Sequence, residues 1–318
     1  MNIERYSYDE LFGVVNGIKI DNAYDLYTLS QYKKIIKEEQ IDYIVSQDYD
    51  LSYLTNYTSI KFLSVPDEVD DIEYIYLLKD LTGLRAKSGI INKLDLSKFT
   101  NLSSVYIVED EYNQIDYNQL KNINNIYLDQ FKFTDLSFIK KDFQVKNLFI
   151  DFCSKLTSLK GIENLNNLET IHLEYCLKLS DISSLSKFNN SLTSLKIIDC
   201  IKILNLETIY NFHNIKTLEL LNRETSVSQK IQSLSFLDNF KSPEYFMTNY
   251  KVLDCNLKPL LRLKDVSILE FYKKYNLKDR DLPHEDVIVK ISDNQRERRK
   301  VKDLEDGINN KNIIWTDE

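Results

Sequence analysis

Apolar residues recur along most of the chain in one short pattern. Each copy reads apolar-x-x-apolar-x-apolar, then a polar stretch, then further apolar residues every three or four positions. The clearest copies begin at Val145, Leu168 and Leu192, which lie 23 and 24 residues apart. Stacked copies of one structural unit produce such a period, so the pattern indicates a repeat protein. Weaker copies begin at eight other positions, namely Ile41, Ile60, Leu81, Leu102, Ile123, Ile215, Ser242 and Val266.

Each half of the unit predicts one element of secondary structure. The apolar-x-apolar core alternates with period two, which is typical of a short strand with one buried face. The later apolar residues fit a helical or 3-10 turn that leads back to the next strand. Neither half can bury its apolar side alone. We therefore expect successive units to stack into a solenoid with a parallel sheet along one face.

The clearest units carry a cysteine at their ninth position, as in VKNLFIDFCSKLTSLKGIENLNN from Val145 and LETIHLEYCLKLSDISSLSKFNN from Leu168. This pattern resembles the leucine-rich repeat family, whose repeat reads L-x-x-L-x-L-x-x-N/C-x-L. The similarity is greatest to the short-repeat bacterial type seen in internalins, and it covers roughly residues 41–275. The chain departs from the family pattern at Pro66, at Ser242 and in the longer unit from Ile215.

The resemblance implies an α/β fold, a leucine-rich repeat solenoid of about 11 repeats. Its curved parallel β-sheet would form the concave face, and short helical or 3-10 segments the convex face. A solenoid exposes its core at both ends, so we expect caps there. Within a single continuous domain, the expected N-terminal cap, solenoid and C-terminal cap are residues 1–40, 41–275 and 276–318.

The ninth position of the leucine-rich repeat points into the core and satisfies neighbouring backbone groups. The resemblance therefore implies that Cys153, Cys176 and Cys200 form a buried structural ladder. The alternatives are metal binding by thiolates or redox pairing. Stacked parallel rungs do not offer the tetrahedral geometry that zinc requires. We expect neither a metal nor a cofactor.

Strand residues between the buried positions face outward, and in the middle units these positions are rich in aromatic and acidic residues. Exposed aromatic clusters mark interfaces, and carboxylates steer and orient a basic partner. The alternative is a merely solvated face, since the chain contains 21 Tyr. The predicted partner-binding residues are Tyr106, Tyr127, Asp129, Phe149, Asp151, Phe152, His172, Glu174, Tyr175, Lys196 and Asp199.

Composition and charge narrow the class of protein. A hydrophobic content of 43% is that of a globular chain, and 41 Lys plus Arg against 49 Asp plus Glu give a net charge of −8. This charge argues against a nucleic-acid partner and favours a basic protein. The chain shows no signal-peptide pattern, no membrane-spanning apolar run and only 4 Cys. We therefore expect a cytoplasmic protein that does not contact a membrane.

These observations favour a non-enzymatic protein–protein interaction module that binds a basic protein on its concave face. By analogy with other repeat proteins, its role would be that of a toxin-neutralising immunity protein or a regulatory protein. One alternative is a secreted or delivered bacterial effector or adhesin. Another is a metal-assisted hydrolase that uses His172, Asp151 and Glu174, since a histidine with two carboxylates can bind a metal or transfer protons. The chain has only 3 His, and none lies in an HExxH motif.

Overall fold

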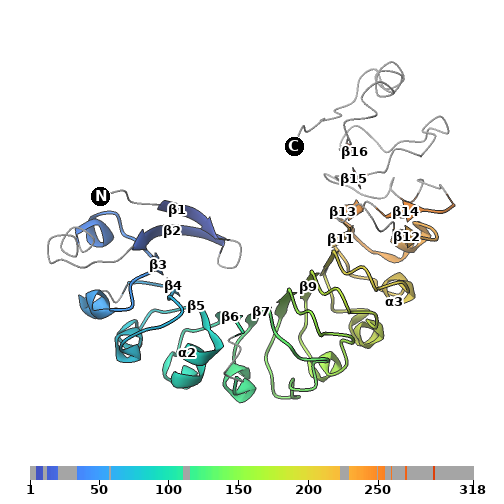
Figure 1. The fold of residues 1–318 in the computed structure, drawn as a ribbon. Helices are drawn as coiled ribbons and strands as arrows, with labels where there is room; N and C mark the ends of the chain where they lie inside the picture. The colour runs from blue at the N-terminus through green and yellow to red at the C-terminus, as the bar shows by residue number, and fades with distance from the viewer. Residues whose placement is uncertain are drawn as a thin grey trace, which may run out of the picture. The chain divides into compact units, whose positions relative to one another are not determined.

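The structure is a computed structural model of the 318-residue chain. It describes residues 5–9, 13–20, 34–56, 59–109, 115–222, 229–248, 250–254, 259, 269–270 and 289–290. The chain divides into two units. The N-terminal unit comprises residues 1–132, 138–150 and 164–166, and the C-terminal unit residues 133–137, 151–163 and 167–318. Most of each unit repeats one order of elements, a strand, a turn and a short helical segment (Figure 1).

The N-terminal unit contains a sheet whose strands follow one another in sequence order. β1 and β2 form an antiparallel pair, and each strand from β2 to β7 pairs in parallel with the next. The strands are β1 (Arg5–Asp9), β2 (Gly13–Ile20), β3 (Tyr43–Ser46), β4 (Phe62–Ser64), β5 (Gly83–Lys87), β6 (Ser104–Val108), β7 (Asn125–Asp129) and β8 (Asn147–Asp151).

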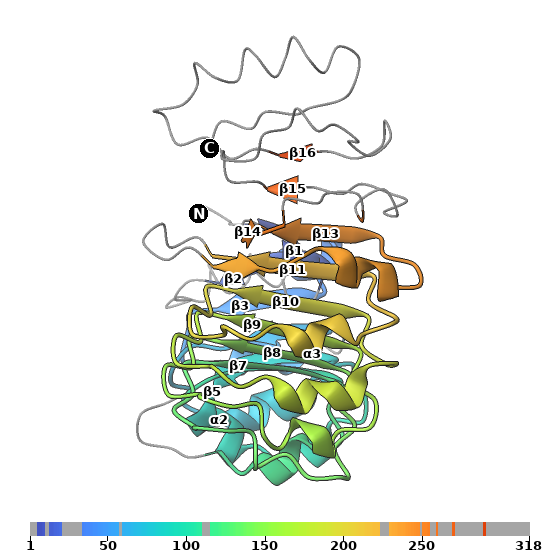
Figure 2. The same ribbon diagram turned by 90° about the vertical axis from the view of Figure 1, so that its right-hand side faces the viewer.

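The C-terminal unit continues the same arrangement. β9 (Thr170–Glu174), β10 (Ser194–Ile198), β11 (Thr217–Leu221) and β13 (Tyr245–Thr248) pair in parallel, residue for residue. Figure 2 shows these strands lying one above another. Two smaller parallel pairs join β12 (Lys230–Ile231) to β14 (Lys251–Val252) and β15 (Leu269–Glu270) to β16 (Val289–Lys290).

Short helical segments lie on one side of the strands (Figure 1). Three of them begin after an aspartate, Asp71, Asp95 or Asp116, whose side chain accepts a hydrogen bond from the backbone N–H two residues on. This bond satisfies one of the free N–H groups at the start of a helix. The segments are η1 (Ser52–Asn56), η2 (Ile72–Leu77), α2 (Ser88–Lys93), η3 (Leu96–Lys98), η4 (Tyr117–Leu120), η5 (Ile162–Asn164), η6 (Ser183–Phe188), α3 (Glu207–Tyr210) and η7 (Ser235–Asn239).

The core of each unit lies between the sheet and these helical segments. Alternate strand residues such as Ile171 and Leu173 in β9 are fully buried, as are Leu179 and Leu185 from the returning segment of the same rung. Burying one such side chain contributes about 1.5–3 kcal/mol. The predicted parallel sheet with short helical and 3-10 segments is therefore confirmed.

The structure adds detail at the ends of the chain. Residues 5–20 contain the β1–β2 pair, which the repeat pattern does not predict, and β2 covers the free edge of β3. A helical turn at residues 34–38 lies within the expected N-terminal cap, residues 1–40. The expected C-terminal cap, residues 276–318, lies outside the described residues apart from β16. Within the described ranges, no helix combines the length and the apolar character needed to cross a bilayer.

One glycine holds a backbone position that other residues cannot occupy. Gly161 has a φ of 104°, and a Cβ added there would lie 2.2 Å from the carbonyl oxygen of Leu136. We expect Gly161→Ala to lower the free energy of unfolding by at least about 2 kcal/mol, because backbone strain and a clash act together. Urea unfolding followed by circular dichroism measures this change. The control Lys160→Ala, at an exposed neighbouring position, should stay within about 0.5 kcal/mol of the parent protein.

Candidate functional site

Four side chains at equivalent positions of consecutive strands form one stack in the N-terminal unit. They are Arg85 from β5, Tyr106 from β6, Tyr127 from β7 and Phe149 from β8. The guanidinium carbon of Arg85 lies 4.1 Å from the centroid of the Tyr106 ring. The centroids of Tyr106 and Tyr127 are 4.3 Å apart, and those of Tyr127 and Phe149 are 5.5 Å apart. We refer to these four residues as the aromatic stack.

The geometry of the stack follows from the sheet. Neighbouring parallel strands are about 4.8 Å apart, and Arg85, Tyr106 and Tyr127 are direct partners in the strand register. The rings are nearly parallel, with interplanar angles of 13° and 8°. Each ring therefore packs its faces against the neighbouring side chains of the stack and is half-buried. The structure thus brings together the three aromatic residues that the sequence places on this face.

One predicted acidic residue of this surface is buried. Asp129, at the end of β7, is only 7% exposed, and its Oδ2 accepts a hydrogen bond of 2.8 Å from the Tyr106 hydroxyl. The expectation that Asp129 presents its charge to a partner is therefore wrong. Its carboxylate instead holds the Tyr106 ring in place, because a buried acceptor gains strongly from such a bond.

The residue that follows each middle strand adopts a left-handed conformation. Gln130, Phe152, Tyr175 and Asp199 occupy the eighth position of their units and have φ values of 64°, 49°, 49° and 54°. Such values are uncommon for residues other than glycine. In the C-terminal unit one bond recurs at this position, since the N–H groups of Phe152, Tyr175 and Asp199 donate to the carbonyl of the following rung at 3.1, 3.1 and 2.9 Å.

Side chains at this left-handed position differ in their exposure. Phe152 is 48% exposed and stacks on Tyr175, with ring centroids 4.6 Å apart. Asp199 holds the equivalent position on the next rung but is fully buried. The expectation that Asp199 faces a partner is therefore wrong. Phe152 shares its left-handed conformation, so burial at the eighth position depends on the neighbouring side chains.

Charged side chains on the sheet face of the C-terminal unit are paired with one another. His172 Nε2 lies 3.2 Å from Glu174 Oε2, and both side chains are 19% exposed. Lys196 Nζ lies 2.7 Å from Glu219 Oε1. Asp151 accepts the N–H of the following residue at 2.9 Å. The predicted acidic residues of this face are thus largely engaged within the chain.

These groups do not form a metal site. Among the residues that the structure describes, no group of three His, Cys, Asp or Glu side chains is placed to hold a metal ion. This finding includes His172, Asp151 and Glu174. His172 and Glu174 lie side by side on the sheet face, and among the described residues no third His, Cys, Asp or Glu joins them.

The three cysteines at the ninth position lie side by side in the core. Cys153, Cys176 and Cys200 are buried free thiols, and each donates to the carbonyl two residues before it. The bond with Cys176 and burial raise the pKa of the Cys200 thiol. A thiolate without exposed surface loses its hydration, so the core favours the neutral thiol.

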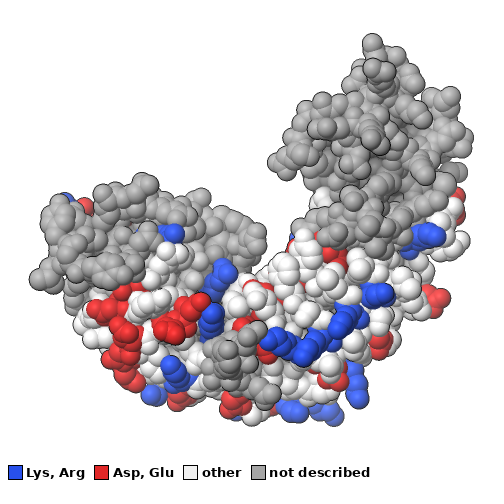
Figure 3. Space-filling view, viewed as in Figure 1, with Lys and Arg blue, Asp and Glu red and all other residues white. Residues whose placement is uncertain are grey.

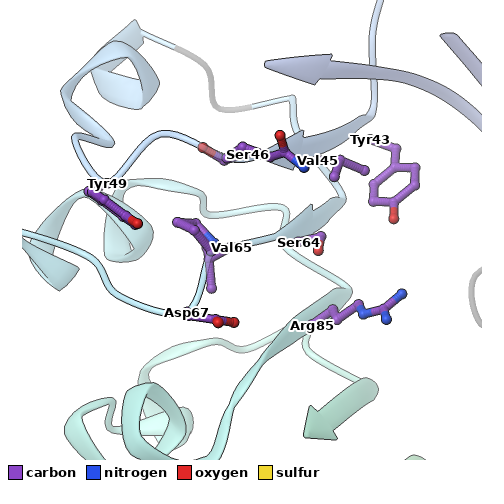
Figure 4. A pocket seen from close by; sticks show the side chains of 10 residues that line it. Tyr43, Val45, Ser46, Tyr49, Ser64, Val65, Asp67 and Arg85 are labelled. Atoms are coloured by element: carbon purple, nitrogen blue, oxygen red, sulfur yellow. The ribbon is translucent and has the colours of Figure 1, made fainter. Parts of the chain in front are cut away.

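A pocket of about 550 Å³ lies at the first rungs of the N-terminal unit, where the sequence predicts no site. Tyr43, Ser64 and Arg85 come from three consecutive strands and lie on one side of it, with Tyr49 and Asp67 on the other (Figure 4). The small Ser64 side chain leaves this space between its larger neighbours. Small residues at Ser46 and Ser64 are the signal by which the sequence could have indicated the pocket. No histidine or cysteine lines it.

Comparison with known proteins adds no identification. No protein-family model matches the chain, and no curated protein matches it.

The burial of the cysteine ladder predicts low thiol reactivity. We expect iodoacetamide to modify Cys153, Cys176 and Cys200 at least about tenfold more slowly in the folded protein than in urea, because all three thiols lie inside the core. Mass spectrometry of tryptic peptides measures the extent of modification at each cysteine. Rapid modification of Cys176 in the folded protein would instead show an accessible thiolate.

Proposed function

We propose that this chain is a non-enzymatic protein-binding module of the leucine-rich repeat type. It holds a partner protein against the open face of its parallel sheet, and the aromatic stack is the anchor. The observation that carries the proposal is the continuous stack of Arg85, Tyr106, Tyr127 and Phe149 on consecutive strands. The register of β5 to β7 supports the leucine-rich repeat assignment, since equivalent positions pair directly.

The chemistry of the stack suits a protein interface. Binding hot spots are enriched in tyrosine and arginine and are surrounded by less important contacts. Mutual stacking and the bond from Tyr106 to Asp129 restrict these side chains before a partner arrives. Little side-chain entropy is then lost on binding, which favours affinity.

Charge supports a basic surface on the partner of the N-terminal unit. The net charge of the whole chain is −8, which attracts basic proteins over a distance. Exposed carboxylates are frequent in the segments that follow β3 and β4, beside the pocket. Figure 3 shows acidic side chains gathered in one area. A role in neutralising or regulating a basic protein fits this distribution. The exposed acidic residues between β3 and β5 are Asp50, Asp67, Glu68, Asp70, Asp71, Glu73 and Asp80.

Removal of two adjacent rings of the stack tests the proposal. In capture experiments from the native cell lysate, we expect Tyr127→Ala combined with Phe149→Ala to reduce recovery of the bound partner at least about tenfold, because hot-spot rings are lost. Quantitative mass spectrometry of captured proteins gives the readout. Circular dichroism checks that the variant is folded.

A matched control removes an aromatic ring from the helical side of the same unit. Tyr74 lies in η2 and is half-exposed, so Tyr74→Ala should leave partner recovery unchanged. If the stack variant is folded and recovers the same proteins in the same amounts as the parent chain, the sheet face is not the binding surface.

A further inference from the structure

Three turns of the C-terminal unit have the same geometry and place a lysine at the same point. In each turn a ninth-position cysteine carbonyl accepts a hydrogen bond from the N–H three residues on, at 3.1, 3.0 and 3.1 Å. The third residue of each turn is an exposed lysine, and each lysine follows the left-handed eighth position by three residues. We refer to these residues, Lys155, Lys178 and Lys202, as the lysine row.

The lysine row is held in line by the rungs beneath it. β9 and β10 pair residue for residue, the rings of Phe152 and Tyr175 stack, and the thiols of Cys153, Cys176 and Cys200 each bond to the backbone carbonyl two residues before them. Successive lysines therefore project from backbone positions about one strand spacing apart, roughly 4.8 Å. Figure 3 shows basic side chains gathered in a line on the face seen there.

The lysine row carries a positive charge that the described chain does not neutralise. Other lysines pair with carboxylates, such as Lys196 with Glu219 and Lys216 with Glu244, at 2.7 and 2.9 Å. No described carboxylate forms an ion pair with a lysine of the row. Like charges on adjacent rungs repel one another. An anionic partner would remove this repulsion and gain attraction from three cations at once.

Exposed apolar side chains lie on the same edge of the unit. Phe152 precedes the first turn and is 48% exposed, Leu177 lies inside the second turn and is 43% exposed, and Leu204 follows the third and is 79% exposed. The charged phosphates of a nucleic acid gain no stabilisation from contact with leucine side chains, whereas the apolar side chains of a polypeptide can bury them. Charge and apolar surface together favour a protein ligand over a nucleic acid.

We infer that the lysine row, with Phe152, Leu177 and Leu204, binds an acidic polypeptide segment that also carries apolar or aromatic side chains. This surface lies in the C-terminal unit and shares no residue with the aromatic stack. It therefore adds a second binding activity, of opposite charge preference, to the proposed function. Its tests do not depend on the partner of the sheet face.

Charge reversal of the row tests the inference directly. The probe is a fluorescein-labelled copolymer of glutamate and tyrosine, and fluorescence anisotropy with the full chain at low salt measures its dissociation constant. Lys155→Glu, Lys178→Glu and Lys202→Glu together should weaken binding about tenfold or more, since three attractive charges become repulsive. Added salt should weaken binding to the parent chain, because the row is exposed.

A second triple variant distinguishes the effect of the lysine row on binding from the effect of the net charge. Lys61→Glu, Lys121→Glu and Lys241→Glu change the net charge by the same amount at exposed positions outside the row. This variant should bind the copolymer within about threefold of the parent chain, because the lysine row itself is unchanged. Equal weakening by both folded variants would overturn the inference, as would a parent chain that does not bind the copolymer.

Two further probes define the chemistry of the ligand. Phe152→Ser with Leu204→Ser should weaken binding of the copolymer about threefold or more but leave binding of poly-glutamate unchanged, because only the copolymer has rings to bury. The same loss of affinity for both probes would show that these apolar side chains are not part of the binding site. Tighter binding of an oligothymidylate than of the copolymer would show a nucleic-acid surface and overturn the assignment to a polypeptide.

Discussion

The backbone hydrogen bonds between parallel strands are the constraint on which the other features depend. They fix the spacing of the rungs at about 4.8 Å and keep equivalent residues opposite one another. A residue type that recurs at one position of the repeat must therefore form a column in space. Tyr106, Tyr127 and Phe149 form such a column on the sheet face, and the cysteines form another in the core. The properties of each surface follow from its column rather than from single residues.

The left-handed residue after each middle strand is the second constraint. It ends the alternation of the strand and turns the ninth position into the core, where the thiols bond to backbone carbonyls. The residue itself then lies at the edge of the sheet, and its burial depends on its neighbours. Phe152 is stacked and exposed, whereas Asp199 is fully buried. One backbone conformation thus sets the boundary between the sheet face and the edge that carries the lysine row.

Periodicity predicted the parallel sheet, the positions of β3 to β11 and the column of outward aromatic residues. These features depend on the repeat, so an alternating pattern is sufficient to locate them. The repeat pattern did not predict features that depend on individual side chains or on segments outside the repeat. Asp129 is buried and accepts a hydrogen bond from the Tyr106 hydroxyl, and Asp199 is buried at the position where the alternation of the strand ends. The β1–β2 pair lies outside the repeat, and the pocket depends on the sizes of several neighbouring side chains.

The distribution of charge distinguishes the two surfaces of the C-terminal unit. On the sheet face, Lys196 pairs with Glu219, and His172 Nε2 lies 3.2 Å from Glu174 Oε2. The polar side chains of this face thus have partners within the chain. Along the turn edge one column holds a lysine on three consecutive rungs, and no described carboxylate forms an ion pair with any of the three. The strand spacing keeps the backbones of these lysines close together, so their side chains can act on one ligand at the same time. An extended anionic segment that follows the column would meet a cation at every rung.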